Sequence, residues 1–449
     1  MPDPSFPSPA RALLALLGAL LVLAPGRSLG EDRPLTLAEA LEMADRRNPE
    51  LGAARDRADA QAARAEGVDR MRWPRLALES RWFRTDNPSM VFASKLNAGE
   101  FTEDDFAISR LNSPEALSHL TTFLSLEAPL DVFGKVRAQS DGQAAFARAM
   151  TAGAREAAAE LRLRVAEAYR RAELAGRAMA ATERAVAGAR AREKDVEARA
   201  EQGAALTADL LRARARRRQR EADLAEQRGE ERVALAGLAR LLGAPPGATY
   251  VPVDRPPAPA PLEGDEAAWT ARAAADRAVI EAAHQRREAG TTLAAGERKG
   301  ALPDLAAFGQ VQDDRNDFSG GGQSWAVGAV LRWAPFDGSR SRRLAAAEAE
   351  SRAAAEDARA AEDQVRLEVE TAWRRALAAR ERHAAAAGGA EEGREALRVV
   401  QERRQAGLAT LTDELETEAM SLGAELEEMR AAVEVALADA ALARAAGEN

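Results

Sequence analysis

The side chains that most often carry out catalysis or bind metals are scarce in this sequence. It contains no cysteine and only three histidines, His119, His284 and His383, no two of which lie close along the chain. This excludes thiolate zinc sites, cysteine nucleophiles, disulfide scaffolds and lipidation at a cysteine. Neither an imidazole metal site nor a histidine-based catalytic triad is expected. We therefore predict a protein that is not an enzyme and that needs no metal or cofactor.

Three further patterns resemble binding sites, and each has a simpler interpretation. The acidic pairs at 104–105 and 313–314 are expected in loops and lack the spacing of a calcium-binding loop. The glycine run at 320–322 is not followed by the Lys-Ser/Thr pair of a phosphate-binding loop. The basic run at 214–220 would point in all directions on a helix. In a chain of net charge −9, this run favours ion pairs between helices over nucleic acid binding.

The composition favours long helices in an exported protein. Of 449 residues, 46% are hydrophobic and 30% are charged, but only 4% are aromatic. Alanine dominates the apolar residues, as is typical of helices with charged faces. Residues 1–30 have the pattern of a secretory signal peptide cleaved near Gly30. Their apolar run, 12–24, is short for a membrane anchor, and any later membrane span is expected to consist of β-strands.

The two halves of the sequence share a series of matching segments. Pro129 and Asp131 recur as Pro335 and Asp337 at an offset of 206 residues, and two later segments, 165–169 and 203–211, recur at an offset of 204. An earlier segment, 74–76, recurs at an offset of 229, so the first copy carries about two dozen extra residues between Pro74 and Pro129. Four ordered matches of this kind indicate an internal duplication. We expect a first repeat over 31–243, a Pro-rich equatorial connector over 244–264 and a second repeat over 265–449.

Each repeat is predicted to run helix, strand, strand, helix, helix. A capping-box pattern begins at Thr36, and Asn48 followed by proline and glutamate restarts the helix. Alternating apolar residues then predict strand pairs over about 75–128 and 304–334. A long loop over 85–118, which includes Asn87 followed by proline, is expected to join the first pair, and a shorter loop over 313–323 the second. The proline-free stretches 135–202 and 339–406 each predict one helix of about 100 Å. Helices of this length require a coiled-coil partner.

Tryptophans mark one face of the predicted strands. Trp325 and Trp333 stand at the two ends of an alternating apolar segment, and Trp82 lies in the first strand pair. Aromatic residues at both ends of an apolar face are typical of membrane-spanning barrel strands, where they form the girdle. The alternative is a half-buried strand of a soluble sheet. Four strands cannot close a wide barrel, so several subunits are expected to share one.

A glycine stands where each long helix should reverse. Gly203 and Gly407 can adopt the left-handed conformation that ends a helix. Asp209 and Asp413 follow six residues later, near the start of the returning helix, where a carboxylate suits the helix dipole. Thr410 precedes Asp413 with capping-box spacing. Each repeat is therefore expected to end in a helical hairpin tip.

The final helix has the apolar spacing of a coiled coil. Its apolar residues step by four and three along one seam, which predicts close packing along a neighbouring helix. The seam consists of Leu415, Ala419, Leu422, Leu426, Met429 and Val433.

The signal peptide, the duplicated element order, the Pro-x-Asp steps into long helices and the glycine-marked tips resemble the TolC-like outer-membrane efflux proteins, or outer membrane factors. The resemblance covers essentially the whole chain after the signal peptide. It implies a mixed α and β membrane protein that forms a homotrimer. Four strands per subunit would form a twelve-stranded β-barrel in outer-membrane lipid, continued by an α-helical coiled-coil barrel in the periplasm.

The resemblance also implies partners. The channel would be a passive exit duct for small molecules, or for proteins in type I secretion. A proton-driven (RND) or ATP-driven (ABC) inner-membrane pump would deliver the cargo through a periplasmic adaptor. Some relatives carry a lipid on an N-terminal cysteine, and because this chain has no cysteine it is expected to be unlipidated.

In the family the hairpin tips dock with the adaptor and form the periplasmic gate. The second tip matches the docking motif better, since Ala204 stands in the first tip where a leucine is expected. Some relatives carry acids before the second tip, and Glu402 is the nearest acid and the candidate gate residue here. The implied docking residues are Gly203, Ala204, Ala205, Leu206, Gly407, Leu408, Ala409 and Thr410.

A competing interpretation is an exported coiled-coil structural or periplasmic scaffold protein without a channel. Such a rod does not need alternating strands that end in tryptophan, and these occur in both repeats.

Overall fold

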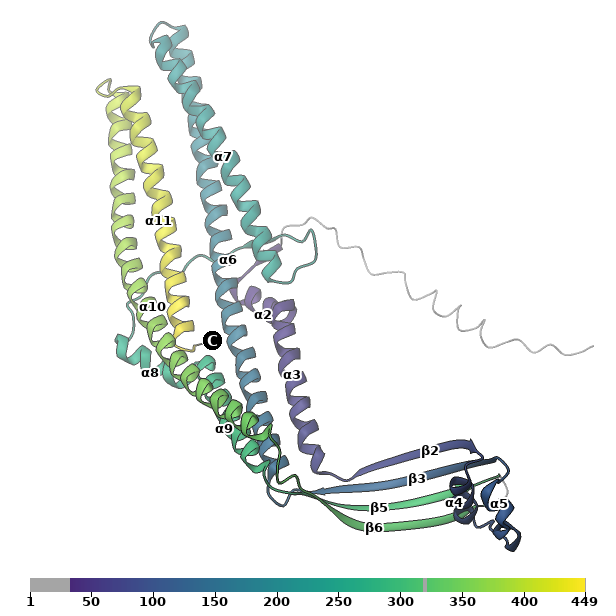
Figure 1. Ribbon diagram of the computed structural model, residues 1–449. Helices are drawn as coiled ribbons and strands as arrows, with labels where there is room; N and C mark the ends of the chain where they lie inside the picture. The colour runs from purple at the N-terminus through teal and green to yellow at the C-terminus, as the bar shows by residue number, and fades with distance from the viewer. Residues whose placement is uncertain (1–32, 318–320, 449) are drawn as a thin grey trace, which may run out of the picture. The chain divides into compact units, whose positions relative to one another are not determined.

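A computed structural model describes residues 33–317 and 321–448 of the chain (Figure 1). The predicted signal peptide, 1–30, lies outside the described residues. The chain divides into two compact units. Unit 1 comprises the described residues of Met1–Ala40 and Ala168–Arg255, and unit 2 those of Leu41–Glu167 and Pro256–Asn449. This division differs from the predicted repeats, whose boundaries remain a prediction.

The predicted helix starts at the N-terminus are confirmed. Thr36 and Glu39 form the capping box at the start of α2 (Leu37–Arg47), with the Thr36 amide 2.9 Å from a Glu39 carboxylate oxygen. The Asn48 side chain accepts hydrogen bonds from two backbone amides of α3 (Pro49–Asp69). A short 3-10 turn, η1 (Arg70–Arg72), follows.

Unit 1 is held together by a buried tyrosine. Tyr169, on α6 (Lys135–Glu201), donates its hydroxyl proton to the Leu35 carbonyl at 2.8 Å. The same oxygen accepts from the amides of Val253 and Asp254 at 3.2 and 3.0 Å. These bonds join the helix to both strands of a small parallel sheet, β1 (Arg33–Leu35) and β4 (Tyr250–Pro252). The sequence predicted a connector there but no strand.

The predicted strands form one antiparallel sheet in unit 2 (Figure 1). The spatial order is β2-β3-β5-β6, so the central pair joins a strand of the first repeat to one of the second. Both β2 and β6 are edge strands within the described residues. The strands are β2 (Arg75–Thr85), β3 (Leu117–Leu130), β5 (Asp304–Arg315) and β6 (Gly322–Arg332).

Two sequence interpretations of loops were wrong. The connection between β2 and β3 is largely helical, because Asn87 caps α4 (Pro88–Ala98) just as Asn48 caps α3. The acids at 313–314 lie inside β5, where Asp314 accepts side-chain hydrogen bonds from His119 and Thr121 of the neighbouring β3. Two shorter elements complete the connection: η2 (Glu103–Phe106) and α5 (Ile108–Asn112).

The long helices end within one residue of the predicted boundaries. They are α6 (Lys135–Glu201) and α10 (Arg340–Gln405). Within unit 2, α10 packs against α8, α9 and α11. Trp269, Ile280, Val365, Val369 and Leu442 contribute to the core between them. The remaining helices are α7 (Thr207–Leu241), α8 (Glu266–Asp276), α9 (Ala278–Lys299) and α11 (Leu411–Ala445).

The seam predicted on α11 is only partly buried. Met429 and Val433 are buried, whereas the part of the seam nearer the tip, from Leu415 to Leu426, is half-buried. There Gly393 of α10 approaches the Ser421 backbone instead, since a Cβ at Gly393 would lie 3.3 Å from the Ser421 Cα. Small residues thus determine the closest approach of the two helices, and the apolar seam turns partly outward.

In the part of the chain that the structure describes, every helix is either too short or too polar to pass through a bilayer.

Candidate functional site

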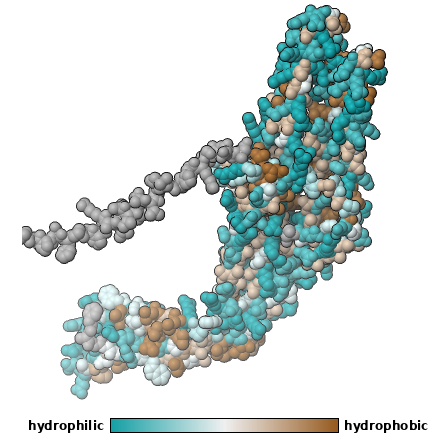
Figure 2. Space-filling view, turned by 180° about the vertical axis from the view of Figure 1, so that it is seen from behind, coloured by the Kyte–Doolittle hydropathy of each residue, from teal (hydrophilic) through white to brown (hydrophobic). Residues whose placement is uncertain are grey.

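The two faces of the four-stranded sheet differ in character. The strand register places one set of alternating residues on an apolar face, and Figure 2 shows hydrophobic side chains gathered over the sheet. A polar row of Ser80, Thr122, Asp313 and Gln323 crosses this face towards the loop end. The apolar face consists mainly of Leu76, Leu78, Trp82, Leu120, Leu124, Leu126, Leu305, Val311, Trp325, Val327 and Leu331.

All three predicted girdle tryptophans are exposed. Trp82 and Trp325 lie on the apolar face and are 67% and 75% exposed. Trp333 follows β6 at the helix end of the sheet, is 59% exposed, and donates its indole N–H to the Ala301 carbonyl at 3.2 Å. Sequence reasoning missed Phe336, three residues further on and 90% exposed. Its position just after the end of a predicted strand could have identified it as a further exposed aromatic residue.

The opposite face, called the polar face below, is mainly hydrophilic, although Phe83, Phe123, Phe308 and Val330 also lie on it. Arg81 and Glu79 form an ion pair at 2.8 Å on β2, and Arg332 of β6 lies 3.3 Å from Glu127 of β3. The polar face includes Arg75, Glu79, Arg81, Ser125, Glu127, Gln310, Gln312, Asp314 and Arg332. A sheet with one apolar and one polar face can separate lipid from water.

The two Pro-x-Asp steps end the strands by different means. Asp131 accepts hydrogen bonds from the amides of Val136 and Arg137 at 3.0 and 2.8 Å, and so caps α6. Pro129 lies within β3, opposite Ala306, beyond the point where β2 stops pairing. A missing N–H is tolerated where a strand has only one neighbour.

The second step uses side chains as well as the backbone. Asp337 accepts from the Ser339 hydroxyl and amide at 2.7 and 2.9 Å, and from Arg343 at 2.9 Å. These bonds hold the pKa of Asp337 well below its usual value, and the bond from the Ser339 hydroxyl makes the largest contribution. Pro335 lies after β6 rather than within it.

Both hairpin tips turn through a left-handed glycine. The φ angles are +73° at Gly203 and +76° at Gly407. In the second tip Thr410 caps α11: its hydroxyl accepts from the Asp413 amide at 3.1 Å, and Asp413 accepts from the Thr410 amide at 2.8 Å. The predicted capping box is confirmed. The hydrogen bonds that Thr410 donates lower the pKa of Asp413, and the one from its backbone amide makes the largest contribution.

Each tip presents one exposed leucine. Leu408 is 70% exposed, as the docking motif implies. In the first tip, Ala204 and Ala205 precede Leu206, which is also 70% exposed. The first tip therefore presents its exposed leucine two positions later than the motif predicts, where Thr410 stands in the second tip.

The candidate gate residue is engaged in an ion pair. Glu402 accepts a hydrogen bond from Arg398 at 2.5 Å, one helical turn away. Arg398 also binds Glu395 at 2.6 Å, and Glu395 is the main cause of the raised pKa of Arg398. Sequence reasoning missed a second pair, Arg404 with the buried Glu414, which joins α10 to α11 below the tip.

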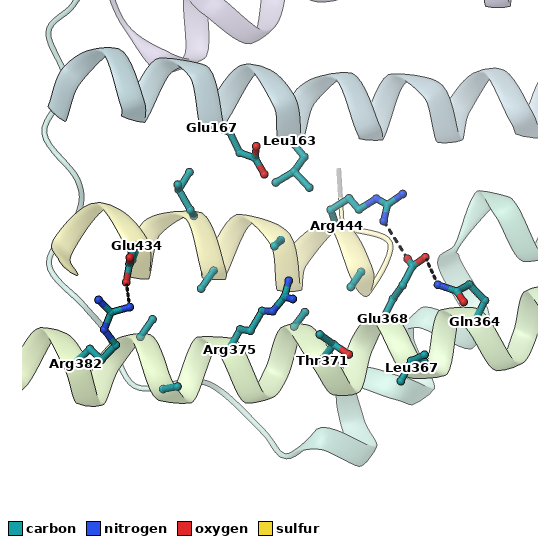
Figure 3. A pocket seen from close by; sticks show the side chains of 17 residues that line it. Leu163, Glu167, Gln364, Leu367, Glu368, Thr371, Arg375, Arg382, Glu434 and Arg444 are labelled. Atoms are coloured by element: carbon teal, nitrogen blue, oxygen red, sulfur yellow. Dashed lines mark hydrogen bonds and ion pairs between the residues drawn. The ribbon is translucent and has the colours of Figure 1, made fainter. Parts of the chain in front are cut away.

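A cavity of about 610 Å³ lies between α6, α10 and α11 within unit 2 (Figure 3). Two of its acids are paired with arginines: Glu368 with Arg444 at 3.0 Å and Glu434 with Arg382 at 2.8 Å. None of the lining residues is a histidine, cysteine, serine or lysine. The lining therefore contributes ion pairs between helices.

The comparison with known sequences establishes the family. The family described as Outer membrane efflux protein matches residues 40–244 and 269–448. The chain belongs to this family, which confirms the resemblance that the sequence patterns indicated. No curated protein matches the chain significantly.

Solved structures share the fold over most of the chain. A membrane protein from Pseudomonas aeruginosa is 24% identical, with a TM-score of 0.77, and the alignment covers 92% of this chain and 93% of that one. The Campylobacter jejuni CmeC outer membrane channel is 16% identical, with a TM-score of 0.78 and coverage of 92% and 85%. The outer membrane protein VceC from Vibrio cholerae is 20% identical, with a TM-score of 0.73 and coverage of 92% and 96%.

Proposed function

We propose that this protein is the outer-membrane exit duct of a tripartite efflux or type I secretion system. Three copies would each contribute four strands to a twelve-stranded barrel, and their helices would continue the duct into the periplasm. A periplasmic adaptor and an inner-membrane pump, of RND or ABC type, would deliver small molecules or proteins. The membership of an efflux family favours transport over catalysis.

The observation that carries this proposal is the four-stranded sheet, in which β2 and β6 each have a free edge within residues 33–317 and 321–448. A strand edge with free N–H and C=O groups cannot remain in a bilayer, where no water satisfies them. The sheet is apolar on one face and polar on the other, as a barrel wall requires. Pairing β6 of one copy with β2 of the next removes every edge and places the apolar face towards lipid.

The half-buried seam on α11 supports the same assembly. From Leu415 to Leu426 its apolar side chains are not fully covered by α10. In a helical barrel each hairpin has neighbours on both sides, and these residues would pack between copies. The proposal also includes the predicted domain boundaries, the girdle tryptophans, the Pro-x-Asp turns and Glu402 as the gate residue. Their proposed roles are those that the family implies.

We assign adaptor docking to the two tips. Each offers an exposed leucine on a glycine turn of fixed geometry, Leu206 after Gly203 and Leu408 after Gly407. An exposed apolar residue on a rigid turn is suited to packing between the helices of a partner.

The test is cell fractionation followed by detergent extraction and electrophoresis with and without boiling. A heat-sensitive trimer from the outer membrane supports the channel. A soluble periplasmic species would instead support the coiled-coil scaffold and contradict the proposal.

A further inference from the structure

The segment between β2 and β3, residues 86–116, is a small folded body rather than an extended loop. Its aromatic rings pack edge to face, Phe92 on Phe101 at 4.6 Å between centroids and Phe101 on Phe106 at 5.1 Å. Lys95 of α4 forms an ion pair with Asp105 of η2 at 2.7 Å. This bond makes the largest of the contributions that lower the pKa of Asp105 to about 2. The segment therefore has internal contacts of its own.

This body lies against the polar face of the sheet. The α4 helix contacts β5 and β6, although it is connected to β2 and β3. A Cβ at Gly322, the first residue of β6, would come within 1.9 Å of the Asn97 carbonyl oxygen. Gly322 pairs with Asp314, so that Cβ would project on the polar face. The end of α4 thus rests on that face, and only glycine at 322 permits the approach.

The burial of polar side chains on the polar face also indicates that the segment covers this face at its loop end. His119, Thr121 and Asp314 share the polar face near the loop end and are 3%, 7% and 1% exposed. His119 and Thr121 both bond to an Asp314 carboxylate oxygen, at 2.9 and 2.8 Å. On the same face of the adjacent β2, the Arg81 side chain remains 67% exposed.

A further hydrogen bond links the sheet to the segment. Asn316 lies one residue beyond β5, and its side chain contacts His119 at 2.7 Å. The Asn316 amide nitrogen also donates to Glu100 at 2.8 Å, just after α4. The segment is thus attached to the polar face through β3, β5 and β6.

We propose that residues 86–116 fold into the outer mouth of the barrel and narrow the exit for solutes. The inference rests on the proposed function, in which the polar face lines the lumen. Whatever covers that face at its loop end then stands inside the opening. Three copies would bring three such bodies around one axis, so the constriction limits bulky molecules that enter from outside more strongly than small ones.

The experiment uses the absence of cysteine from the chain. One cysteine is introduced as Gln310→Cys, on the polar face deeper than Asp314. Intact cells are treated from outside with a small charged maleimide or with one that carries a bulky polyethylene glycol chain. The reference variant is Asp86→Cys, which is exposed at the loop end of β2.

Two perturbations of the segment are compared. In the first, residues 88–114 are replaced by a short Gly-Ser turn, which is feasible because Thr85 pairs with Leu117 across the hairpin. In the second, Gly322→Ala forces the end of α4 away from the sheet. Its matched control is Gly309→Ala, also within a strand, where the new Cβ meets only Val327 at an ordinary 3.6 Å.

We expect the bulky reagent to label Gln310→Cys severalfold faster in the trimmed and Gly322→Ala backgrounds than in the native or Gly309→Ala backgrounds. The small reagent should label it at similar rates in all four. Equal labelling by the bulky reagent in native and perturbed backgrounds would overturn the constriction while leaving the channel intact. If neither reagent labels Asp86→Cys, the outer-membrane location itself is wrong and both proposals fall. If the trimmed chain fails to assemble, the comparison of Gly322→Ala with Gly309→Ala, labelled by the bulky reagent, tests the constriction instead.

Discussion

Replacing Gly407 with valine tests the assignment of the second hairpin tip to adaptor docking. Gly407 holds φ at +76°, a conformation that costs an L-residue about 1–2 kcal/mol. Apart from the two chain neighbours, no heavy atom lies within 4 Å of the position where a Cβ would stand, so the Cβ itself meets no other residue. The main expected effect is backbone strain at the tip.

A cost of this size lowers the population of the native tip about five- to thirty-fold relative to a relaxed turn. The trimer should assemble normally, because the barrel and the helix core lie outside the strained turn. Adaptor capture by the purified trimer, and resistance of the cells to a pump substrate, should both fall. The assays are co-purification with the adaptor, growth in the presence of the substrate, and gel mobility of the unboiled trimer.

The matched control is Gly388→Val. Gly388 lies within α10, has open space around its Cβ position and has no positive φ, so the same substitution introduces no comparable strain. Wild-type adaptor capture and efflux in Gly407→Val would refute the tip assignment, as would equal losses in both variants.

Three further results are expected. Trp325→Asp with Trp333→Asp should abolish outer-membrane trimer, because lipid-facing charges are costly, whereas Gln310→Asp on the polar face should assemble; equal membrane yields would contradict the girdle role. Because its hydrogen bonds lower the pKa of Asp413, the capping box stabilises the tip above pH 3.8 and loses this contribution as the pH falls through the lowered value; hydrogen exchange of the tip amides should accelerate there, but not in Asp413→Asn. Tyr169→Phe removes three hydrogen bonds from a buried site and should reduce stability by about 2 kcal/mol; an unchanged denaturation midpoint would argue against that contribution.

Local patterns predicted most of the elements. Proline-free, alanine-rich stretches identified α6 and α10 to within a residue, since a long helix is determined by its own hydrogen bonds and periodicity. Alternation identified the strands and placed Trp82 and Trp325 on the exposed apolar face. The Thr410 and Asp413 capping box was visible because both partners lie within one turn.

The missed features depend on contacts between distant residues or on ambiguous short patterns. Asn87 before proline was interpreted as a loop, although the same pair at Asn48 was recognised as a helix start. A helix of eleven residues without a strong apolar period gives no further signal. The Tyr169 contact with Leu35 spans 134 positions in sequence, and no local pattern predicts it.

The most direct test of the central claim is to cross-link the two sheet edges. In the cysteine-free chain, Ser80→Cys on β2 is combined in turn with cysteines at 323, 325 and 327 along β6, and membranes are oxidised before denaturing electrophoresis. Pairing between copies predicts covalent trimers for the combination in register, and none for either single cysteine. Monomers throughout a series moved along the whole of β6 would contradict the shared barrel.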